Sequence, residues 1–178
     1  MFDKVFISYA KEDYQFAEKL YIYLSENGFD PWLDKKNLLP GQQWDYEIKK
    51  GLREANYVIL MLSNNSVKKR GYVQREFKLA VKYFEEKLED DIYLIPIKID
   101  KCNAPENLSA FQWIEISDHS FDVILKSLNI QQNKYLEFQQ EQLNKHRTFE
   151  TKEVKEDFLY KKKDKPENRI FLLPICRY

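Results

Sequence analysis

The sequence predicts an α/β domain with a doubly wound, five-stranded parallel sheet, followed by a charged extension. Short apolar runs alternate with stretches whose apolar residues recur every three or four positions, as strands alternate with amphipathic helices in βα units. The run Tyr57–Leu62 is nearly unbroken, which is typical of a parallel strand covered on both faces. A chain of 178 residues with 43% hydrophobic residues supports one ordinary core and an appendage. We place the domain at residues 1–129 and the extension at residues 130–178.

The first strand and helix are separated by a polar turn that ends at Asp13. Lys4–Tyr9 is an apolar, β-rich run, and Asp13 is placed to cap the helix that follows. The helix is expected over Tyr14–Asn27, because Gly28 supplies the left-handed residue that ends a helix.

The second strand is predicted to lie at an edge of the sheet. It spans Phe29–Leu33 and contains Pro31, which has no N–H group to donate to a neighbouring strand. A polar loop, Asp34–Gln43, turns at Pro40–Gly41 and leads into a helix over Trp44–Glu54.

The third strand, Tyr57–Leu62, is joined by a polar loop at 63–72 to a helix that begins near Tyr72. The apolar residues of this helix keep a spacing of three and four. Glu76 lies on or at the edge of that apolar stripe. A charged carboxylate on the buried face of a helix is unfavourable unless it has a partner or a function.

Two further strands and a helix complete the predicted domain. The fourth strand spans Ile92–Ile99, and Pro96 in its middle indicates a bulge or a side without a hydrogen-bonded neighbour. Trp113–Ile116 is the fifth strand and Phe121–Leu128 the closing helix. With the second strand at an edge, the common strand order 2-1-3-4-5 is expected.

The extension is charged and rich in Gln and Lys. We expect a helix over Gln131–Lys145, a solvated turn at 161–166 and a strand at 169–175. That last strand is consistent either with a further strand at the sheet edge or with a chain that continues beyond residue 178.

Composition excludes several classes of function. The 29 basic and 29 acidic residues cancel, so the excess of positive charge that nucleic-acid binding requires is missing. Apolar runs reach about six residues against the ~20 that span a bilayer, and no signal peptide is visible. Cys102 and Cys176 lack paired spacing, and His119 and His146 lie in surface-like contexts. We expect a reduced, cytoplasmic protein without a metal site, a membrane segment or a nucleic-acid partner.

The predicted topology points to one crevice. In open α/β sheets, ligands bind outside the carboxyl ends of the strands, where the strand order reverses. For the order 2-1-3-4-5 this place lies between strands one and three. It is bordered by the loop at 9–13 and the loop at 63–72. Glu76, in the first turns of the following helix, is expected to lie at the opening of the same crevice.

Familiar catalytic motifs are missing from this crevice. The sequence has no G-x-G-x-x-G or G-x-x-x-x-G-K phosphate loop and no nucleophile elbow. The third strand ends in Leu-Ser-Asn-Asn instead of the aspartate that a phosphoacceptor domain requires. Dehydrogenases, P-loop NTPases, serine hydrolases and receiver domains are therefore disfavoured.

Several ordered motifs resemble the successive boxes of a TIR domain. They are Val5–Tyr9, Phe29–Asp34 with Leu39–Gly41, Ile59–Ser63 and Tyr72–Glu76, and the later strands Ile95–Ile99 and Phe111–Trp113 are similar to those of bacterial members. The resemblance covers residues 1–129 and implies a flavodoxin-like fold. Some members of this family signal by homotypic assembly. Others, including bacterial antiphage effectors, cleave NAD+ between nicotinamide and ribose.

The resemblance implies a catalytic role for Glu76, which matches the catalytic glutamate of the enzymatic members. The aromatic residue four positions earlier is most often Trp in the family and is Tyr72 here, which keeps a stacking face. Crevice position and motif match together give the binding candidates: Phe6, Ser8, Tyr9, Lys11, Asp34, Gly41, Ser63 and Tyr72. Leu39 replaces an acidic residue found in some members, so no polar contact is expected from it.

Two functions follow as expectations. The first is an NAD+ hydrolase with NAD+ as substrate and no other cofactor, active when TIR domains assemble through the loop at 34–43. One carboxylate suffices for this reaction, because nicotinamide is already a cationic leaving group and only the charge developing on the ribose needs stabilising. The alternative is a non-catalytic module that signals by assembly through the same loop. From helix pattern alone, Glu76 is more often a plain flanking carboxylate.

Overall fold

The computed structural model describes residues 3–68, 72–88 and 90–163, with side chains given up to residue 145 except at Tyr72. The chain divides into two compact units, Met1–Gln132 and Asn133–Tyr178.

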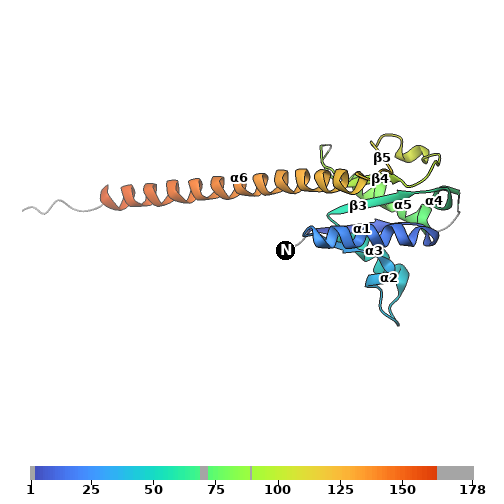
Figure 1. Ribbon diagram of the computed structural model, residues 1–178. Helices are drawn as coiled ribbons and strands as arrows, with labels where there is room; N and C mark the ends of the chain where they lie inside the picture. The colour runs from blue at the N-terminus through green and yellow to red at the C-terminus, as the bar shows by residue number, and fades with distance from the viewer. Residues whose placement is uncertain (1–2, 69–71, 89, 164–178) are drawn as a thin grey trace, which may run out of the picture. The chain divides into compact units, whose positions relative to one another are not determined.

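The first unit is built on a five-stranded, all-parallel sheet with the strand order β2-β1-β3-β4-β5 (Figure 1). The strands are β1 Lys4–Ser8, β2 Asp30–Trp32, β3 Tyr57–Leu62, β4 Leu94–Lys98 and β5 Ile114–Glu115. The predicted fold class and strand order are confirmed. β1 lies between β2 and β3, so the order reverses where the predicted crevice was placed.

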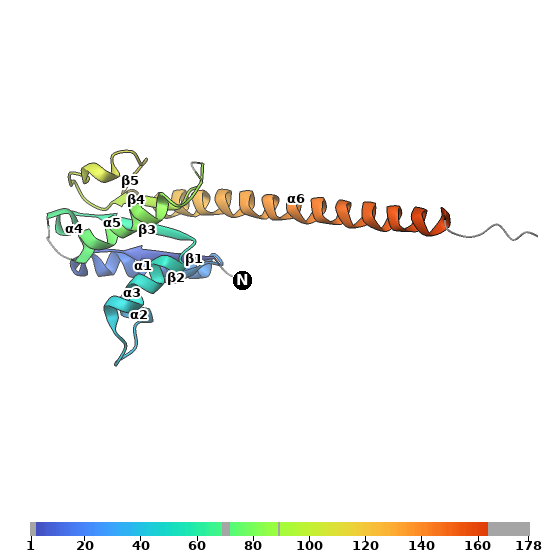
Figure 2. The same cartoon turned by 180° about the vertical axis from the view of Figure 1, so that it is seen from behind.

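Helices cover both faces of this sheet (Figures 1 and 2). They are α1 Tyr14–Glu26, α2 Asp34–Asn37, α3 Trp44–Glu54, α4 Asn64–Lys68, α5 Tyr72–Phe84 and α6 Ser120–Lys163, with 3-10 turns at Lys11–Asp13 and Glu106–Leu108. α1 and the first turns of α6 pack on one face, and α3 and α5 pack on the other.

Alternation along β1 assigns each side chain to one of these two layers. Val5, Ile7 and Tyr9 belong to the core under α1 and α6, whereas Phe6 belongs to the core under α3 and α5. Successive side chains of a strand point to opposite faces, so Ser8 shares the face of Phe6. The last residue of β1 is thereby directed toward α5.

Both prolines of the sheet lie where a missing N–H group costs little. Pro31 is in β2, at the edge, as predicted. Pro96 is in the inner strand β4, whose residue Lys98 accepts a hydrogen bond from Ile116 beside β5. Hydrogen bonds alternate between the two neighbours of a strand, so the nitrogen of Pro96 also faces the β5 side. β5 begins only opposite Ile97, so no described strand lies beside the nitrogen of Pro96. This is the side without a hydrogen-bonded neighbour that the sequence predicted.

Two short helices stand where loops were predicted. α2 occupies the start of the segment Asp34–Gln43, where the side chain of Asn37 accepts a hydrogen bond from the Leu33 N–H at 2.8 Å. α4 occupies the start of the loop after β3. Both are too short for an apolar periodicity to reveal them.

The extension also differs from the prediction. α6 runs without interruption from Ser120 to Lys163, although two separate helices were expected on either side of residue 129. No Gly or Pro lies between those two predicted helices, so nothing in the sequence breaks the hydrogen-bond ladder. Residues 161–163, predicted as part of a turn, are helical, and the predicted strand at 169–175 lies outside the described residues. None of the described helices has the length and hydrophobicity needed to cross a bilayer.

Candidate functional site

Glu76 lies in the second turn of α5 with its carboxylate buried. Only 8% of the residue is exposed. Its carboxylate oxygen Oε2 accepts a hydrogen bond from the hydroxyl of Ser8, at the carboxyl end of β1. The side chain therefore points at the strand-order reversal and not along the helix surface.

Burial makes Glu76 a weak acid. Loss of solvent raises its pKa from the ordinary value of 4.5 to about 7, against the opposing effect of the hydrogen bond from Ser8. The nearby charge of Asp34 raises the pKa further. The carboxylate therefore changes its charge close to neutral pH.

Asp34 is held beside this carboxylate by Tyr9. The Tyr9 hydroxyl donates to Asp34 Oδ1 at 2.5 Å, and the backbone N–H of Lys35 donates to the same oxygen at 2.6 Å. Burial, followed by this contact with Asp34, raises the pKa of Tyr9 far above its usual value. Ser8, Tyr9, Asp34 and Glu76 thus form one group, the Glu76 cluster, drawn from the end of β1 and the residue that follows it, from α2 and from α5.

Contacts with α1 hold α2 in place. Lys36 Nζ lies 2.5 Å from Glu18 Oε1, which also accepts a hydrogen bond from the Tyr14 hydroxyl at 2.9 Å. Lys35 Nζ lies 4.0 Å from the centre of the Tyr14 ring. Exposed contacts of this kind contribute little individually, because solvent screens them. Together they define where Asp34 begins its helix.

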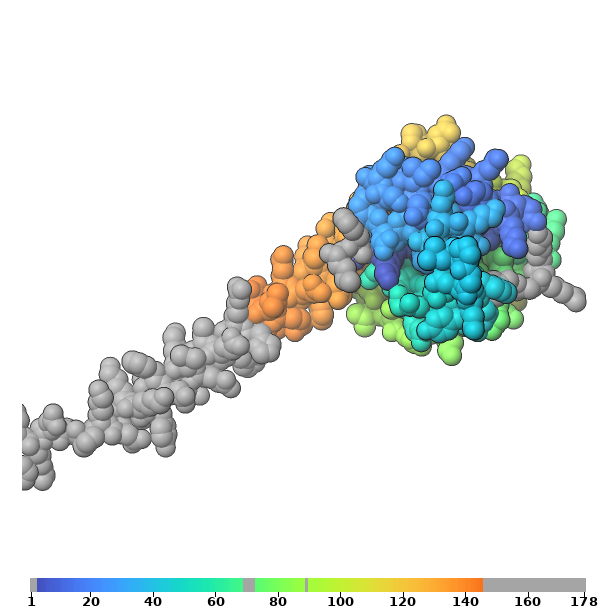
Figure 3. Space-filling view, turned by 90° about the horizontal axis from the view of Figure 1, so that it is seen from below, coloured from blue at the N-terminus to red at the C-terminus, as the bar shows by residue number. Residues whose placement is uncertain are grey.

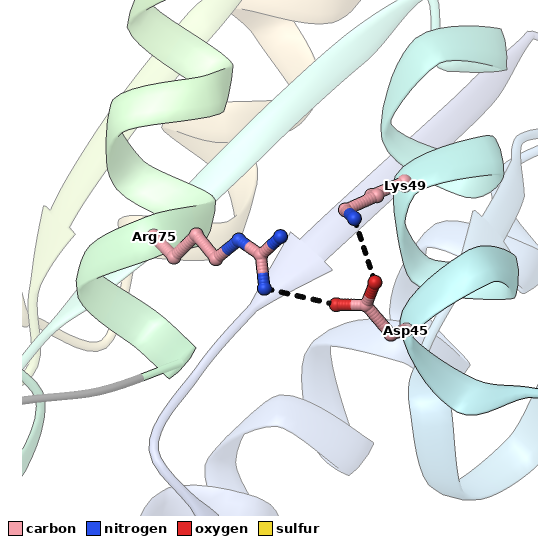
Figure 4. A network of polar contacts seen from close by, with 3 residues as sticks. All are labelled: Asp45, Lys49 and Arg75. Carbon is pink, nitrogen blue, oxygen red and sulfur yellow. Dashed lines mark hydrogen bonds and ion pairs between the residues drawn. The ribbon is translucent and has the colours of Figure 1, made fainter.

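Arg75 precedes Glu76 in sequence but does not neutralise it. Its guanidinium contacts Asp45 Oδ1 at 3.1 Å, and Lys49 Nζ contacts Asp45 Oδ2 at 2.6 Å (Figure 4). The network ties the start of α3 to α5. The cation adjacent to Glu76 is thus engaged on a different helix.

Ser63, predicted as a binding residue, is fully buried at the start of α4. Its N–H donates to Ser66 Oγ at 2.8 Å, and the Ser66 N–H donates to Ser63 Oγ at 3.0 Å, a reciprocal arrangement like a capping box. The Ser63 hydroxyl donates to Asp13 Oδ2 at 2.5 Å. These bonds connect the loops after β1 and β3.

Asp13 has a different role from the predicted one. It occupies the N-cap position of α1, but its side chain makes no capping hydrogen bond there. The carboxylate instead accepts hydrogen bonds from Ser63 and, at 3.1 Å, from Asn65 Nδ2. In the sequence, only the position of Asp13 in the turn after β1 could have indicated this role.

The remaining predicted binding residues lie apart from the described contacts of the Glu76 cluster. Phe6 is in the core, 1% exposed and stacked on Trp32 with a centroid distance of 4.8 Å. Lys11 and Gly41 are exposed, and Gly41 adopts a φ of 90° that favours glycine. Tyr72 is the first residue of α5, and its side chain lies outside the described part. Within that part, no group of three or more potential metal ligands is found.

We expect Ser63→Ala to lower the free energy of unfolding by about 1–2 kcal/mol, since it removes an N-cap and a partner of Asp13. Urea denaturation measures the change. Ser25→Ala is the matched control, because the Ser25 hydroxyl is exposed and bonds only to the preceding turn of α1. Equal stability of the two variants would contradict the capping role.

Comparison with known proteins identifies similar domains. The family model of the TIR domain matches residues 5–128. The TIR domain of the Toll-related receptor TRR-2 from Hydra magnipapillata superposes with a TM-score of 0.59 at 18% identity, covering 70% of this chain and 97% of that one. A metazoan TIR-STING receptor from C. gigas gives 0.57 at 22% identity, covering 69% of this chain and 38% of that one. No curated protein sequence matched significantly. At these identities the structural likeness concerns the fold.

Proposed function

The chain belongs to the TIR domain family, and from that premise we propose that it is an NAD+ hydrolase that cleaves the bond between nicotinamide and ribose. The observation that carries the proposal is the buried Glu76 carboxylate at the strand-order reversal. A buried carboxylate without a cationic partner costs stability, and such groups concentrate at functional sites. Among the described residues, no ion pair joins a Lys or Arg to Glu76.

The proposed reaction needs one negative charge in the right place. The electron pair of the glycosidic C–N bond leaves with nicotinamide, which departs as a neutral molecule, and positive charge develops on the ribose. The Glu76 carboxylate stabilises that charge, and water then adds to the anomeric carbon and releases a proton. Burial strengthens the stabilisation because it lowers the local dielectric constant. Only the ionised carboxylate acts in this way, so the reaction requires a pH near or above about 7.

The other predicted binding residues keep their roles as proposals. Tyr9, directly after β1, and Asp34 of α2 border the carboxylate. Lys11 and Gly41 are exposed in the turns after β1 and α2, and we propose that they contact NAD+ from there. The Tyr72 ring completes the proposed contacts with NAD+. Phe6 and Ser63 are buried, so we propose that they support the site from the core and from the cap of α4.

We further propose activation by assembly through the loop at 34–43, as part of a cytoplasmic antiphage response of bacterial type. Figure 3 looks onto the face where residues of α1, in blue, adjoin residues of the 34–55 segment, in cyan. Leu39, Trp44 and Tyr46 in this segment are 66%, 53% and 57% exposed. Neighbouring exposed apolar side chains are typical of protein-protein contact sites. In an assembly, the loop of one domain would complete the site of the next.

The same exposed residues favour a second candidate, a non-catalytic module that signals by homotypic assembly. Its contact surface would be the loop at 34–43 and the start of α3, with no demand on Glu76. The two candidates differ in what they require of that carboxylate.

Nicotinamide release distinguishes them. The chain is incubated with NAD+, alone and under conditions that promote assembly, and free nicotinamide is followed by chromatography. The hydrolase releases nicotinamide when assembled, and both Glu76→Ala and Glu76→Gln abolish the release while the fold is retained. An assembled protein that releases none would establish the non-catalytic module.

A further inference from the structure

Ser8 is the described side chain that contacts the Glu76 carboxylate directly. It is the last residue of β1, is 1% exposed, and donates its hydroxyl hydrogen to Glu76 Oε2. An ionised carboxylate accepts hydrogen bonds only, so this contact fixes the direction of the hydroxyl. Residues 68 positions apart are joined in the interior by this bond.

None of the described cations near Glu76 forms an ion pair with its carboxylate, so the hydrogen bond from Ser8 stabilises the negative charge alone among the described contacts. Directly after β1, Tyr9 directs its hydroxyl to Asp34, and Asp34 of α2 is itself an acid. On α3, Asp45 is engaged with Lys49 and with Arg75 of α5. At the end of β4, Lys98 Nζ lies over the Trp113 ring, 4.0 Å from its centre.

We propose that Ser8 is a positioning residue for Glu76, which it holds through Oε2 in the ionised form while leaving Oε1 to face the substrate. This proposal rests on the proposed function, and it specifies which residue keeps the catalytic carboxylate ionised. Without the hydroxyl, the buried carboxylate loses this hydrogen-bond donor and keeps its proton to a higher pH.

Two neighbours act on Glu76 in opposite directions. The hydrogen bond from Ser8 lowers the pKa of Glu76, and the negative charge of Asp34 raises it. Ser8→Ala therefore raises the pH at which Glu76 titrates, whereas Asp34→Asn lowers it. Asparagine keeps an oxygen for the Tyr9 hydroxyl, so the second change removes the charge with little loss of structure. General damage to the site would shift both variants the same way.

The test is a pH titration of the Glu76 carboxyl carbon by NMR in the full chain labelled with 13C-glutamate. The resonance is identified by its absence from the Glu76→Gln spectrum. We expect a midpoint near 7 in the unaltered chain. In Ser8→Ala the midpoint rises by about one pH unit, the equivalent of one charge-assisted hydrogen bond. In Asp34→Asn it falls.

Two further variants keep the test decisive. Ser8→Thr retains a hydroxyl and keeps the midpoint within a few tenths of the unaltered value. Ser25→Ala, at an exposed serine of α1, leaves the midpoint unchanged. An unchanged midpoint in Ser8→Ala, or a shift of the same sign in Ser8→Ala and Asp34→Asn, would overturn the proposal.

The NMR titration does not depend on NAD+ cleavage, so the two proposals fail separately. If the assembled chain releases nicotinamide, the acid limb of its pH-rate profile moves upward in Ser8→Ala and downward in Asp34→Asn, by the same amounts as the NMR midpoints. If no nicotinamide is released, the proposed function falls, while the midpoints still decide the role of Ser8.

Discussion

Glu76→Gln should stabilise the folded domain at pH 8 by about 3 kcal/mol, although the same change should abolish NAD+ cleavage. The pKa of Glu76 is about 7 in the folded protein and 4.5 ordinarily, so the folded state holds this proton more tightly than the unfolded state. The stability that this proton contributes is fully present below about pH 4.5. It falls as the pH rises to about 7 and stays low above it. Glutamine imitates the protonated carboxyl and removes that loss.

Urea denaturation at pH 4.5 and at pH 8 checks this expectation. The difference in free energy of unfolding between Glu76→Gln and the unaltered chain should be small at pH 4.5 and large at pH 8. Glu137→Gln is the matched control, because Glu137 is exposed on α6 and its change should matter by less than about 0.5 kcal/mol at either pH. A Glu76→Gln variant less stable than the unaltered chain at pH 8 would mean that the carboxylate holds the fold together.

Phe77→Ala should have an effect of similar size and opposite sign. Phe77 follows Glu76 on α5, is 1% exposed and packs in the core under α3 and α5. Truncation of a buried phenylalanine removes its transfer free energy and leaves a cavity, at a cost of about 3–5 kcal/mol. The cavity lies beneath the helix that carries Glu76, so nicotinamide release should also fall.

The midpoint of urea denaturation measures the loss. Phe138→Ala provides the same chemical change at a side chain that is 56% exposed, and should cost less than about 0.5 kcal/mol. A loss below about 1 kcal/mol for Phe77→Ala would contradict the packing of α5 against β1 and β4. Two adjacent residues of α5 thus give opposite expectations. Phe77→Ala tests packing and should destabilise the domain, whereas Glu76→Gln removes a buried charge and should stabilise it.

The fold was predictable because its signals are local and chemically simple. The apolar run Tyr57–Leu62 marks a strand buried on both faces, and every residue of β3 is buried. Pro31 marks an edge strand, and this single residue selects the strand order. The two missed helices, α2 and α4, depend on single side-chain bonds such as the Ser63–Ser66 pair. Such bonds have no periodic signature.

Four of the predicted site residues lie together in the structure, but their pairings were not predictable. Topology directed attention to the ends of β1 and β3, and the structure brings Ser8, Tyr9, Asp34 and Glu76 into one cluster. That Ser8 pairs with Glu76 and Tyr9 with Asp34 follows from the alternation of side chains at the end of β1 and from the position of α2. α2 itself was not predicted. The burial of Glu76, which raises the pKa of its carboxyl group, arises from packing between distant segments.

The most direct test of the functional role of Glu76 is the pH dependence of nicotinamide release by the assembled chain. We expect the rate to rise with pH and to reach half its maximum near pH 7, where the carboxylate becomes ionised. Glu76→Gln should give no release at any pH. A rate that is independent of pH between about 5 and 9, or that persists in Glu76→Gln, would contradict a mechanism in which the charge of Glu76 stabilises the ribosyl cation.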